Sequence, residues 1–403
     1  MSKRYSFVAC CLIVFVFLTC RVYYSEWGRW PPLKVTTWDA LGYYMYLPAI
    51  FIYNDTRELN WFPSVDEEYA VSGGVFYQAG RQENGSYVFK YLGGVAILQM
   101  PFFFAGHLAA GYLGYKTDGF SSPYQWAVAI GALFYFAVML FVLRKVLLRF
   151  FSDTVVAITL VLLCLATNMI QYVAADSAQS HSFLLPLYAL LLYTSVRWHE
   201  KPALIHAVLT GYIIGLATIC RPTEAVMLFI PLLWNLHSKE KAKEKWSLVK
   251  RHKSHLVAAV IAGFAAILPQ LVYWQYSTGS FIYNVGSKWD FLTPHLRVLT
   301  GWEKGWIIYT PVTLFFLVGL FFVNRFPFKK AVVVFCLLNL YIIISWHDWR
   351  YGGSYSARAL VQSYPVFALP FAAFISKIIL TRWRFGFFAM GLFLVYLNLF
   401  QIW

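Results

Sequence analysis

Apolar segments, each about as long as a membrane is thick, recur along the whole 403-residue chain. A helix that crosses the hydrocarbon core needs roughly 20 apolar residues. Charged residues are 13% of the sequence, whereas a soluble protein carries about 25%, so a water-soluble fold is excluded. The sequence therefore predicts an all-α polytopic membrane protein with eleven transmembrane helices, at 6–24, 124–143, 154–174, 182–197, 203–220, 222–237, 256–275, 306–323, 331–346, 359–377 and 385–402.

Lysine and arginine predict the orientation of the chain, because they accumulate on the cytoplasmic side of a membrane. The basic clusters fall on one side if the N-terminus is cytoplasmic and the equally apolar segment 91–115 does not cross. If 91–115 crossed, every later segment would reverse and this asymmetry would be lost. We therefore interpret 91–115 as an interfacial or re-entrant helix in a first outer loop, 25–123, and 238–255 as a basic cytoplasmic loop.

This topology predicts a single transmembrane domain, 1–403, without a C-terminal soluble domain. A net charge of +15 would suggest nucleic acid in a soluble protein, but here the excess lies on the inner side of the membrane, so no nucleic-acid partner is expected. The spans carry no Asp, Glu, Lys or Arg at mid-depth, which argues against a coupled transporter. The polar loops instead favour a cavity at the outer surface.

Asp39 is the first candidate for catalysis. It follows the first span by about fifteen residues and lies close in sequence to Trp38, Tyr43, Tyr44 and Tyr46. Packing among these rings would partly desolvate the carboxylate, raise its pKa and favour a role as a base. A helix N-cap or a surface acid is the alternative interpretation.

Two short outer turns between spans carry further candidates. Asp176 and His181 lie in the first turn, where Asp176 would hold an acceptor or a metal and His181 would donate a hydrogen bond. Arg221 and Glu224 lie in the second turn. Turn chemistry and helix capping are an alternative explanation for the first pair, and a simple ion pair across the turn for the second.

The densest group of candidates is the segment 346–358, WHDWRYGGSYSAR. Its two adjacent glycines let the backbone approach a ligand closely, and its aromatic rings can stack on a sugar. Arg358, at the outer end of a span, suits a phosphate, and Lys90 would complete a cationic pair. The alternative interpretation of this segment is an aromatic belt at the membrane interface, which would account for the Trp and Tyr residues but not for the two glycines followed by arginine. The alternative for Lys90 is that its long side chain simply reaches from the membrane to water.

In this order the motifs resemble the GT-C superfamily of polytopic glycosyltransferases, which use lipid-phosphate-linked sugars and include protein O-mannosyltransferases and aminoarabinose transferases. The resemblance rests on Trp38-Asp39-Ala40, Asp176, Arg221-Pro222 and Gly352-Gly353-Ser354 with Arg358. With the candidates above, it implies catalysis by Asp39, donor phosphate binding by Lys90, Arg221 and Arg358, and acceptor or sugar binding by Asp176, His181, Glu224, Trp346, Asp348 and Tyr351.

The sequence departs from the family at residue 89, a Phe where some relatives place an acid that can bind metal. The sequence therefore does not establish a cofactor, and it leaves open whether a divalent metal ion binds. The resemblance implies transfer of a sugar from a polyprenyl-phosphate-linked donor to a hydroxyl of a glycan, lipid or protein, in the bacterial inner membrane with the active site facing the periplasm. A flippase for lipid-linked saccharides and a non-catalytic membrane subunit are the alternative hypotheses.

Overall fold

The predicted apolar segments all form helices in the computed structural model, which describes residues 4–27 and 33–402. Lys3, part of the expected cytoplasmic N-terminus, lies outside these ranges, as do residues 28–32 of the outer loop. The all-α prediction is confirmed by α1 (Arg4–Tyr23), α6 (Ser122–Leu147), α7 (Asp153–Leu165), α8 (Ser180–Glu200), α9 (Leu204–Cys220), α10 (Phe229–Leu233), α12 (Lys253–Thr278), α15 (Thr313–Gly319), α16 (Lys329–Ile344), α17 (Tyr364–Ile378) and α18 (Arg384–Ile402).

Shorter helical pieces extend several of these helices. They are η1 (Gln171–Ala175) after α7, η2 (Pro222–Leu228) before α10, α14 (Trp306–Tyr309) before α15, η3 (Leu320–Phe322) after α15 and η4 (Arg358–Ser363) before α17. By length and composition, six helices of the described ranges could cross a membrane, namely α1, α5, α6, α12, the η4–α17 unit and α18.

Burial separates one central helix from the peripheral ones. In the apolar stretch of the η4–α17 unit 89% of the residues are buried in the protein, against 17% for α12 and 22% for α18. The peripheral helices therefore expose their sides to lipid, whereas η4–α17 is packed against protein. Arg358 begins this central unit and thus stands at a well-fixed position.

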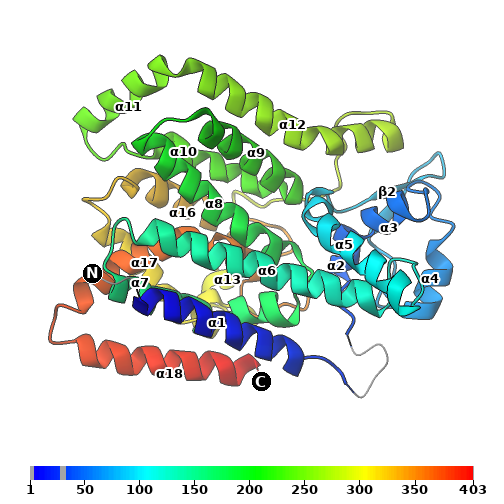
Figure 1. The fold of residues 1–403 in the computed structure, drawn as a ribbon, viewed down its shortest axis with the longest axis horizontal. Coiled ribbons are helices and arrows are strands. Elements are labelled where there is room, and N and C mark those ends of the chain that lie inside the picture. Colours follow the sequence, from blue (N-terminus) through cyan, green and yellow to red (C-terminus); the bar gives the residue numbers. More distant parts are fainter. Residues whose placement is uncertain (1–3, 28–32, 403) are drawn as a thin grey trace.

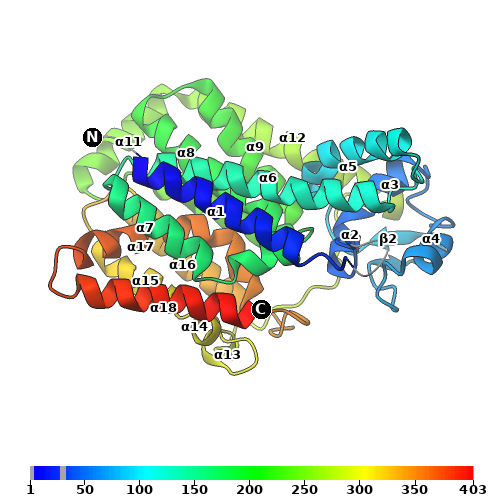
Figure 2. The same ribbon diagram turned by 60° about the horizontal axis from the view of Figure 1, so that its bottom comes forward.

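The two ends of the bundle differ in character (Figure 1). The N-terminus and the basic helix α11 (Lys239–Arg251) lie at one end. The first outer loop lies at the other, with α2 (Asp39–Tyr44), α3 (Tyr46–Phe51) and α4 (Phe62–Tyr69). A later loop contains α13 (Arg297–Thr300), which lies away from α11 in the turned view (Figure 2). This arrangement agrees with the predicted separation of the basic loop from the polar outer loops.

The helix α5 (Gly94–Leu113) runs beside only the first half of α6. The Tyr135 hydroxyl donates to the Leu98 carbonyl at 2.9 Å, and Gly106 packs on the backbone of Tyr124 near the start of α6. Tyr135 is about 20 Å along α6 from its first residue at the usual helical rise. This placement favours the predicted interfacial or re-entrant helix, although α5 is long and apolar enough to span.

A small β-hairpin between α4 and α5 was not predicted. Its strands β1 (Ala79–Arg81) and β2 (Tyr87–Phe89) pair antiparallel, with Ala79 opposite Phe89. The turn contains Asn84-Gly85, with Gly85 at φ +84°, which suits a tight hairpin connection. The pairing continues below the strands, because the Lys90 amide donates to the Gln78 carbonyl at 2.9 Å.

Close packing of α9 on α12 yields a first prediction. A Cβ atom added at Gly211 would lie 1.8 Å from the Ala259 carbonyl oxygen, so the two backbones touch. We expect Gly211→Val to force the helices apart and to lower the free energy of unfolding by about 3 kcal/mol. Thermal unfolding in detergent micelles measures this. Gly386→Val is the matched control, since a Cβ there meets no atom within 4 Å, and an equal loss in both variants would contradict the packing argument.

Candidate active site

Asp39 begins α2, and three side chains hold its carboxylate. Oδ1 accepts hydrogen bonds from the hydroxyls of Tyr77 at 2.7 Å and Tyr91 at 2.6 Å, and Oδ2 accepts one from the Arg358 guanidinium at 2.6 Å. The chain enters α2 through Trp38 at φ +53°, a conformation that few non-glycine residues adopt. With 23% of its side chain exposed, Asp39 is held firmly and is still accessible.

The pKa of Asp39 departs from the sequence prediction. Burial raises the pKa of this carboxyl, but the charge of Arg358 and the hydrogen bonds from Tyr77 and Tyr91 outweigh burial and lower it to about 2. The expectation of a raised pKa was wrong, because it considered the aromatic surroundings without the cation that they enclose. Asp39 is therefore ionised at neutral pH, as a proton acceptor must be.

Arg358 connects the outer loop to the central helix. Its Nη2 binds Asp39 and its Nη1 donates to Gln179 Oε1 at 3.1 Å, and only 14% of the side chain is exposed. Gly352, at φ +62°, lies close to it, since a Cβ added there would be 3.9 Å from Arg358 Nη2. The two residues singled out most strongly in the sequence, Asp39 and Arg358, thus form one ion pair.

Lys90 lies beside the same tyrosines. Its Nζ is 5.0 Å from the ring centroid of Tyr77 and 5.7 Å from that of Tyr91, within the range of cation–π attraction. The side chain is exposed. Two of the three cations predicted to bind the donor phosphate, Lys90 and Arg358, therefore lie next to Asp39 or its tyrosine partners.

A second polar cluster is formed by side chains of α8, η2 and η4, the helical segment that begins with Arg358. Gln362 bridges two residues: its Oε1 is 2.9 Å from His181 Nδ1, and its Nε2 donates to Glu224 Oε1 at 3.0 Å. Glu224 also accepts from the Tyr188 hydroxyl and is 1% exposed. Arg221 Nη1 is 3.5 Å from His181 Nδ1. The residues described here show no Arg221–Glu224 salt bridge, so the simple ion pair across the turn does not form.

The buried position of Glu224 yields a second prediction. Glu224→Ala leaves the Tyr188 hydroxyl and the Gln362 amide without their acceptor in a dry site, so we expect the free energy of unfolding to fall by about 3 kcal/mol. Thermal unfolding in detergent tests this against Glu68→Ala, which removes an exposed ion pair with Lys116 and should change stability by less than about 1 kcal/mol. Equal stability of the parent and Glu224→Ala would contradict the assignment.

Asp176 follows η1 and is held by Gln171, whose Nε2 donates to Asp176 Oδ2 at 3.0 Å. The side chain is exposed at the protein surface. Enclosure raises the pKa of Asp176, and Gln171 together with the charges of Arg358 and Arg21 partly offsets this. Asp176 therefore lies within electrostatic reach of Arg358 without bonding to it.

The segment 346–358 folds over this region with unequal exposure. The rings of Trp346 and Tyr351 pack with centroids 4.5 Å apart. Tyr351 is 3% exposed and its hydroxyl donates to the Ile343 carbonyl at 2.6 Å, whereas Trp346 is half-buried and Asp348 is exposed. Trp346 and Asp348 can therefore reach a ligand directly, while Tyr351 supports Trp346 from behind.

Sequence reasoning missed Tyr77, Tyr91 and Gln362. Tyr77 and Tyr91 meet because the hairpin register that places Ala79 opposite Phe89 also places residue 77 opposite residue 91. The Asn84-Gly85 turn between alternating residues was the available signal. Gln362 lies inside an apolar segment, one turn after Arg358, and its position in the sequence carries no such signal.

An apolar groove of about 500 Å³ opens beside the second cluster, where the turn after Arg221 meets α16. Trp289 in its wall pairs through its backbone with Trp346. The groove therefore adjoins both the arginine turn and the 346–358 segment. It is lined by Pro222, Thr223, Ala225, Val226, Phe229, Trp289, Phe291, Leu338 and Ile342.

The acids of the site do not fit a metal centre. Within 4–27 and 33–402 no group of three or more His, Cys, Asp or Glu side chains is arranged to hold a metal ion. Both carboxylate oxygens of Asp39 already accept hydrogen bonds, from Tyr77, Tyr91 and Arg358.

Comparison with known proteins agrees with this fold. A family model described as dolichyl-phosphate-mannose-protein mannosyltransferase matches residues 119–274. Two solved structures match 98% of the chain: the archaeal oligosaccharyltransferase AglB from Archaeoglobus fulgidus with an inhibitory peptide and a dolichol-phosphate (TM-score 0.52, 10% identity), and an Archaeoglobus fulgidus oligosaccharyltransferase in the apo form (TM-score 0.54, 12% identity). No curated protein matches the sequence.

The chain spans only 55% and 54% of the length of those two proteins, and at such identities the likeness concerns the fold. The predicted resemblance to the GT-C superfamily is confirmed by the family model and by these structures together.

Proposed function

We propose that this chain, which shares the GT-C fold, transfers a sugar from a polyprenyl-phosphate-linked donor to a hydroxyl group at the outer face of the membrane. One observation carries the proposal. An ionised carboxylate and two cations, Asp39 with Arg358 and Lys90, lie together at the end of the bundle opposite the basic helix α11. A base and a phosphate site must be adjacent for this reaction.

The donor would bind by its two unlike parts. Its phosphate would contact Arg358 and Lys90, with Arg221 nearby, because guanidinium and ammonium groups neutralise phosphate well. Its isoprenoid tail would lie in the apolar groove that begins at Pro222. Trp346 would stack on the sugar, and Asp176, His181 and Asp348 would bind hydroxyls of the sugar or acceptor. Glu224 and Tyr351 are buried and would act by holding Gln362 and Trp346.

In the reaction, the acceptor oxygen attacks the anomeric carbon while the bond from that carbon to the phosphate oxygen breaks. The electron pair of the broken bond stays on the lipid phosphate, where Arg358 and Lys90 stabilise the growing charge. The proton of the acceptor hydroxyl passes to Asp39. One carboxylate base suits a single displacement with inversion at the anomeric carbon.

Donor binding would also activate the base. In the structure Arg358 neutralises Asp39 and keeps the pKa of that carboxyl at about 2, which makes it a weak base. An incoming phosphate competes for the same guanidinium, so Asp39 loses part of its counter-charge and its pKa rises. Proton acceptance then becomes favourable only when the donor is in place.

The natural setting would be a bacterial inner membrane, with the N-terminus in the cytoplasm and the site facing the periplasm. The acceptor would be a glycan, a lipid or a protein. Mass spectrometry of cell-envelope glycans, glycolipids and proteins with the chain deleted, restored, and restored as Asp39→Asn tests the function. We expect one sugar modification to disappear on deletion and to return only with the parent chain. An unchanged envelope on deletion would count against the proposal.

A further inference from the structure

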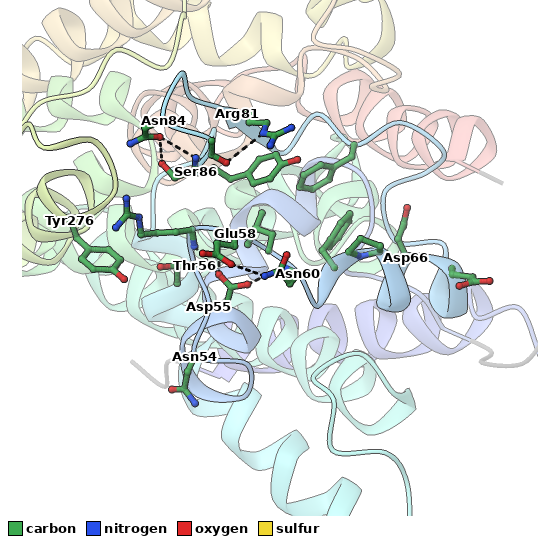
Figure 3. Close-up of a pocket in the computed structure, with 18 residues that line it drawn as sticks. Asn54, Asp55, Thr56, Glu58, Asn60, Asp66, Arg81, Asn84, Ser86 and Tyr276 are labelled. Atoms are coloured by element: carbon green, nitrogen blue, oxygen red, sulfur yellow. Dashed lines mark hydrogen bonds between the residues drawn. The ribbon is translucent and has the colours of Figure 1, made fainter.

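A large cavity beside the hairpin has no role in the chemistry above. It encloses about 1330 Å³ between the loop that precedes α4, the hairpin turn and the end of α12. In Figure 3, Arg81, Asn84 and Ser86 lie along one side, Thr56, Glu58 and Asn60 along the other, and Tyr276 at one end. This volume exceeds the roughly 300–1,000 Å³ of ordinary small-molecule pockets.

The hairpin links this cavity to the base. Phe76 lines the cavity, and the next residue, Tyr77, donates its hydroxyl to Asp39. Tyr87 also lines the cavity, and the same strand ends just before Lys90 and Tyr91. Residues that line the cavity are therefore close neighbours in the chain of residues that hold or flank the candidate catalytic carboxylate. The cavity is therefore a suitable place for an acceptor to bind before transfer.

The polar groups that remain free define the chemistry of the ligand. Asp55 is committed to the backbone amides of Arg57, Glu58 and Asn60 at 3.1, 2.8 and 2.9 Å. Asp66 is committed to Ser72 at 2.7 Å. These two of the four wall carboxylates thus shape the loop and are not open to a ligand. The other two, Glu58 and Glu67, are exposed, and Glu58 Oε2 accepts a hydrogen bond from Asn60 Nδ2 at 2.7 Å.

Arg57 and Arg81, the two arginines of the cavity wall, are not committed in the way that Asp55 and Asp66 are. Among the described residues neither Arg57 nor Arg81 has a carboxylate partner. The Arg57 guanidinium lies 5.3 Å from the Tyr276 ring centroid, and Arg81 Nε donates a long hydrogen bond of 3.4 Å to the Gly85 carbonyl. Both forks keep donors available, and amide side chains lie near them in the wall.

Aromatic faces complete the lining. Phe62 and Phe76 pack at 4.2 Å, and Phe76 and Tyr87 at 6.1 Å, so three rings follow one another along the wall, while Tyr276 is 61% exposed. The described lining contains one open-chain aliphatic side chain, Leu59. Such a wall offers no place for an acyl chain. Planar hydrogen-bonding groups alternating with ring faces instead suit a chain of sugar rings.

We infer that this cavity binds the acceptor and that the acceptor is a glycan of several sugar residues. The inference rests on the proposed transferase function. It narrows the acceptor from a glycan, a lipid or a protein to a glycan.

The test uses the purified full-length chain in liposomes with a polyprenyl-phosphate-linked sugar, and measures release of polyprenyl phosphate. Three fractions of the cell envelope are added separately: water-soluble glycans, peptides, and organic-phase lipids. We expect the glycan fraction to stimulate release. In Arg81→Gln and Asn60→Ala, on facing walls, the glycan concentration for half-maximal stimulation should rise about tenfold or more, as for loss of a charge-assisted or neutral hydrogen bond in a ligand site. Lys288→Gln, an exposed outer-loop change outside the cavity, should match the parent.

Stimulation by peptides or lipids in place of glycans would overturn the assigned class. A response of both cavity variants equal to that of Lys288→Gln would overturn the assigned place, and parallel measurement of the donor KM separates an acceptor effect from a general loss. If the parent releases no polyprenyl phosphate with any fraction, the proposed function itself fails, and this inference fails with it.

Discussion

Replacing Asp39 by asparagine is expected to lower kcat for sugar transfer by about 10³-fold, within the range measured for loss of a general base. Asparagine keeps the size of the side chain and can still accept from Tyr77 and Tyr91, but it cannot take the acceptor proton. Donor affinity should stay the same or increase, because Arg358 no longer has a carboxylate to neutralise. Single-turnover transfer and donor binding, measured on the same protein in liposomes, test both parts.

Two comparisons make this result specific. Glu68→Gln, an exposed outer acid paired with Lys116, should transfer at the parent rate. In the parent, the acid limb of kcat should lie at higher pH than that of kcat/KM, because the pKa of about 2 applies to the free protein and rises when donor occupies Arg358. Transfer by Asp39→Asn at the parent rate would remove Asp39 as the base. A flippase would transfer no sugar with either protein.

Replacing Arg358 by alanine is expected to lower kcat/KM for the donor by about 10²- to 10³-fold, since it removes a preorganised cation from the leaving phosphate. It also leaves the partly buried Asp39 without its counter-ion, so we expect the free energy of unfolding to fall by about 2 kcal/mol. Arg358→Lys should recover part of the rate. It keeps the charge but cannot reach Asp39 and Gln179 with one planar fork.

Arg350→Ala is the matched control for this prediction. Arg350 lies in the same outer segment and pairs with Glu303, but its side chain is 58% exposed, so its loss should change neither donor affinity nor stability by much. Undiminished donor affinity in Arg358→Ala would contradict the phosphate assignment. A loss of stability without a loss of donor affinity would limit Arg358 to holding α2 on the central helix.

The apolar helices could be predicted from sequence because the membrane imposes a length and a composition on them, although only six helices of the described ranges, α5 among them, are long and apolar enough to count as candidate spans. Every apolar segment became helical, and the placement of α5 along half of α6 agrees with an interpretation made from basic residues far away in the chain. The hairpin was missed because its strands have three residues each, too short for a periodic signal. Although the hairpin is small, it matters for the site, because it brings Tyr77 and Tyr91 to the candidate base.

The site could be predicted in its residue types and less well in its contacts. Asp39 and Arg358 were chosen separately, 319 positions apart, and no local pattern indicated that they would bind one another. That contact reversed the expected direction of the Asp39 pKa. Glu224 was predicted to bind acceptor or sugar, with an ion pair to Arg221 as the alternative, but it faces Tyr188 and Gln362, because η2 turns it into the bundle. Contacts between distant segments depend on the packing of whole helices.

The most direct test is release of polyprenyl phosphate by the purified chain. The protein is placed in liposomes with a polyprenyl-phosphate-linked sugar and an envelope extract that contains acceptors, and the lipid products are quantified by mass spectrometry. If the paired carboxylate and cations form a transferase site, the parent chain yields polyprenyl phosphate and a sugar-modified product in equal amounts, and Asp39→Asn yields neither above background. Intact donor after incubation with the parent chain, or equal release by both proteins, would contradict the assignment.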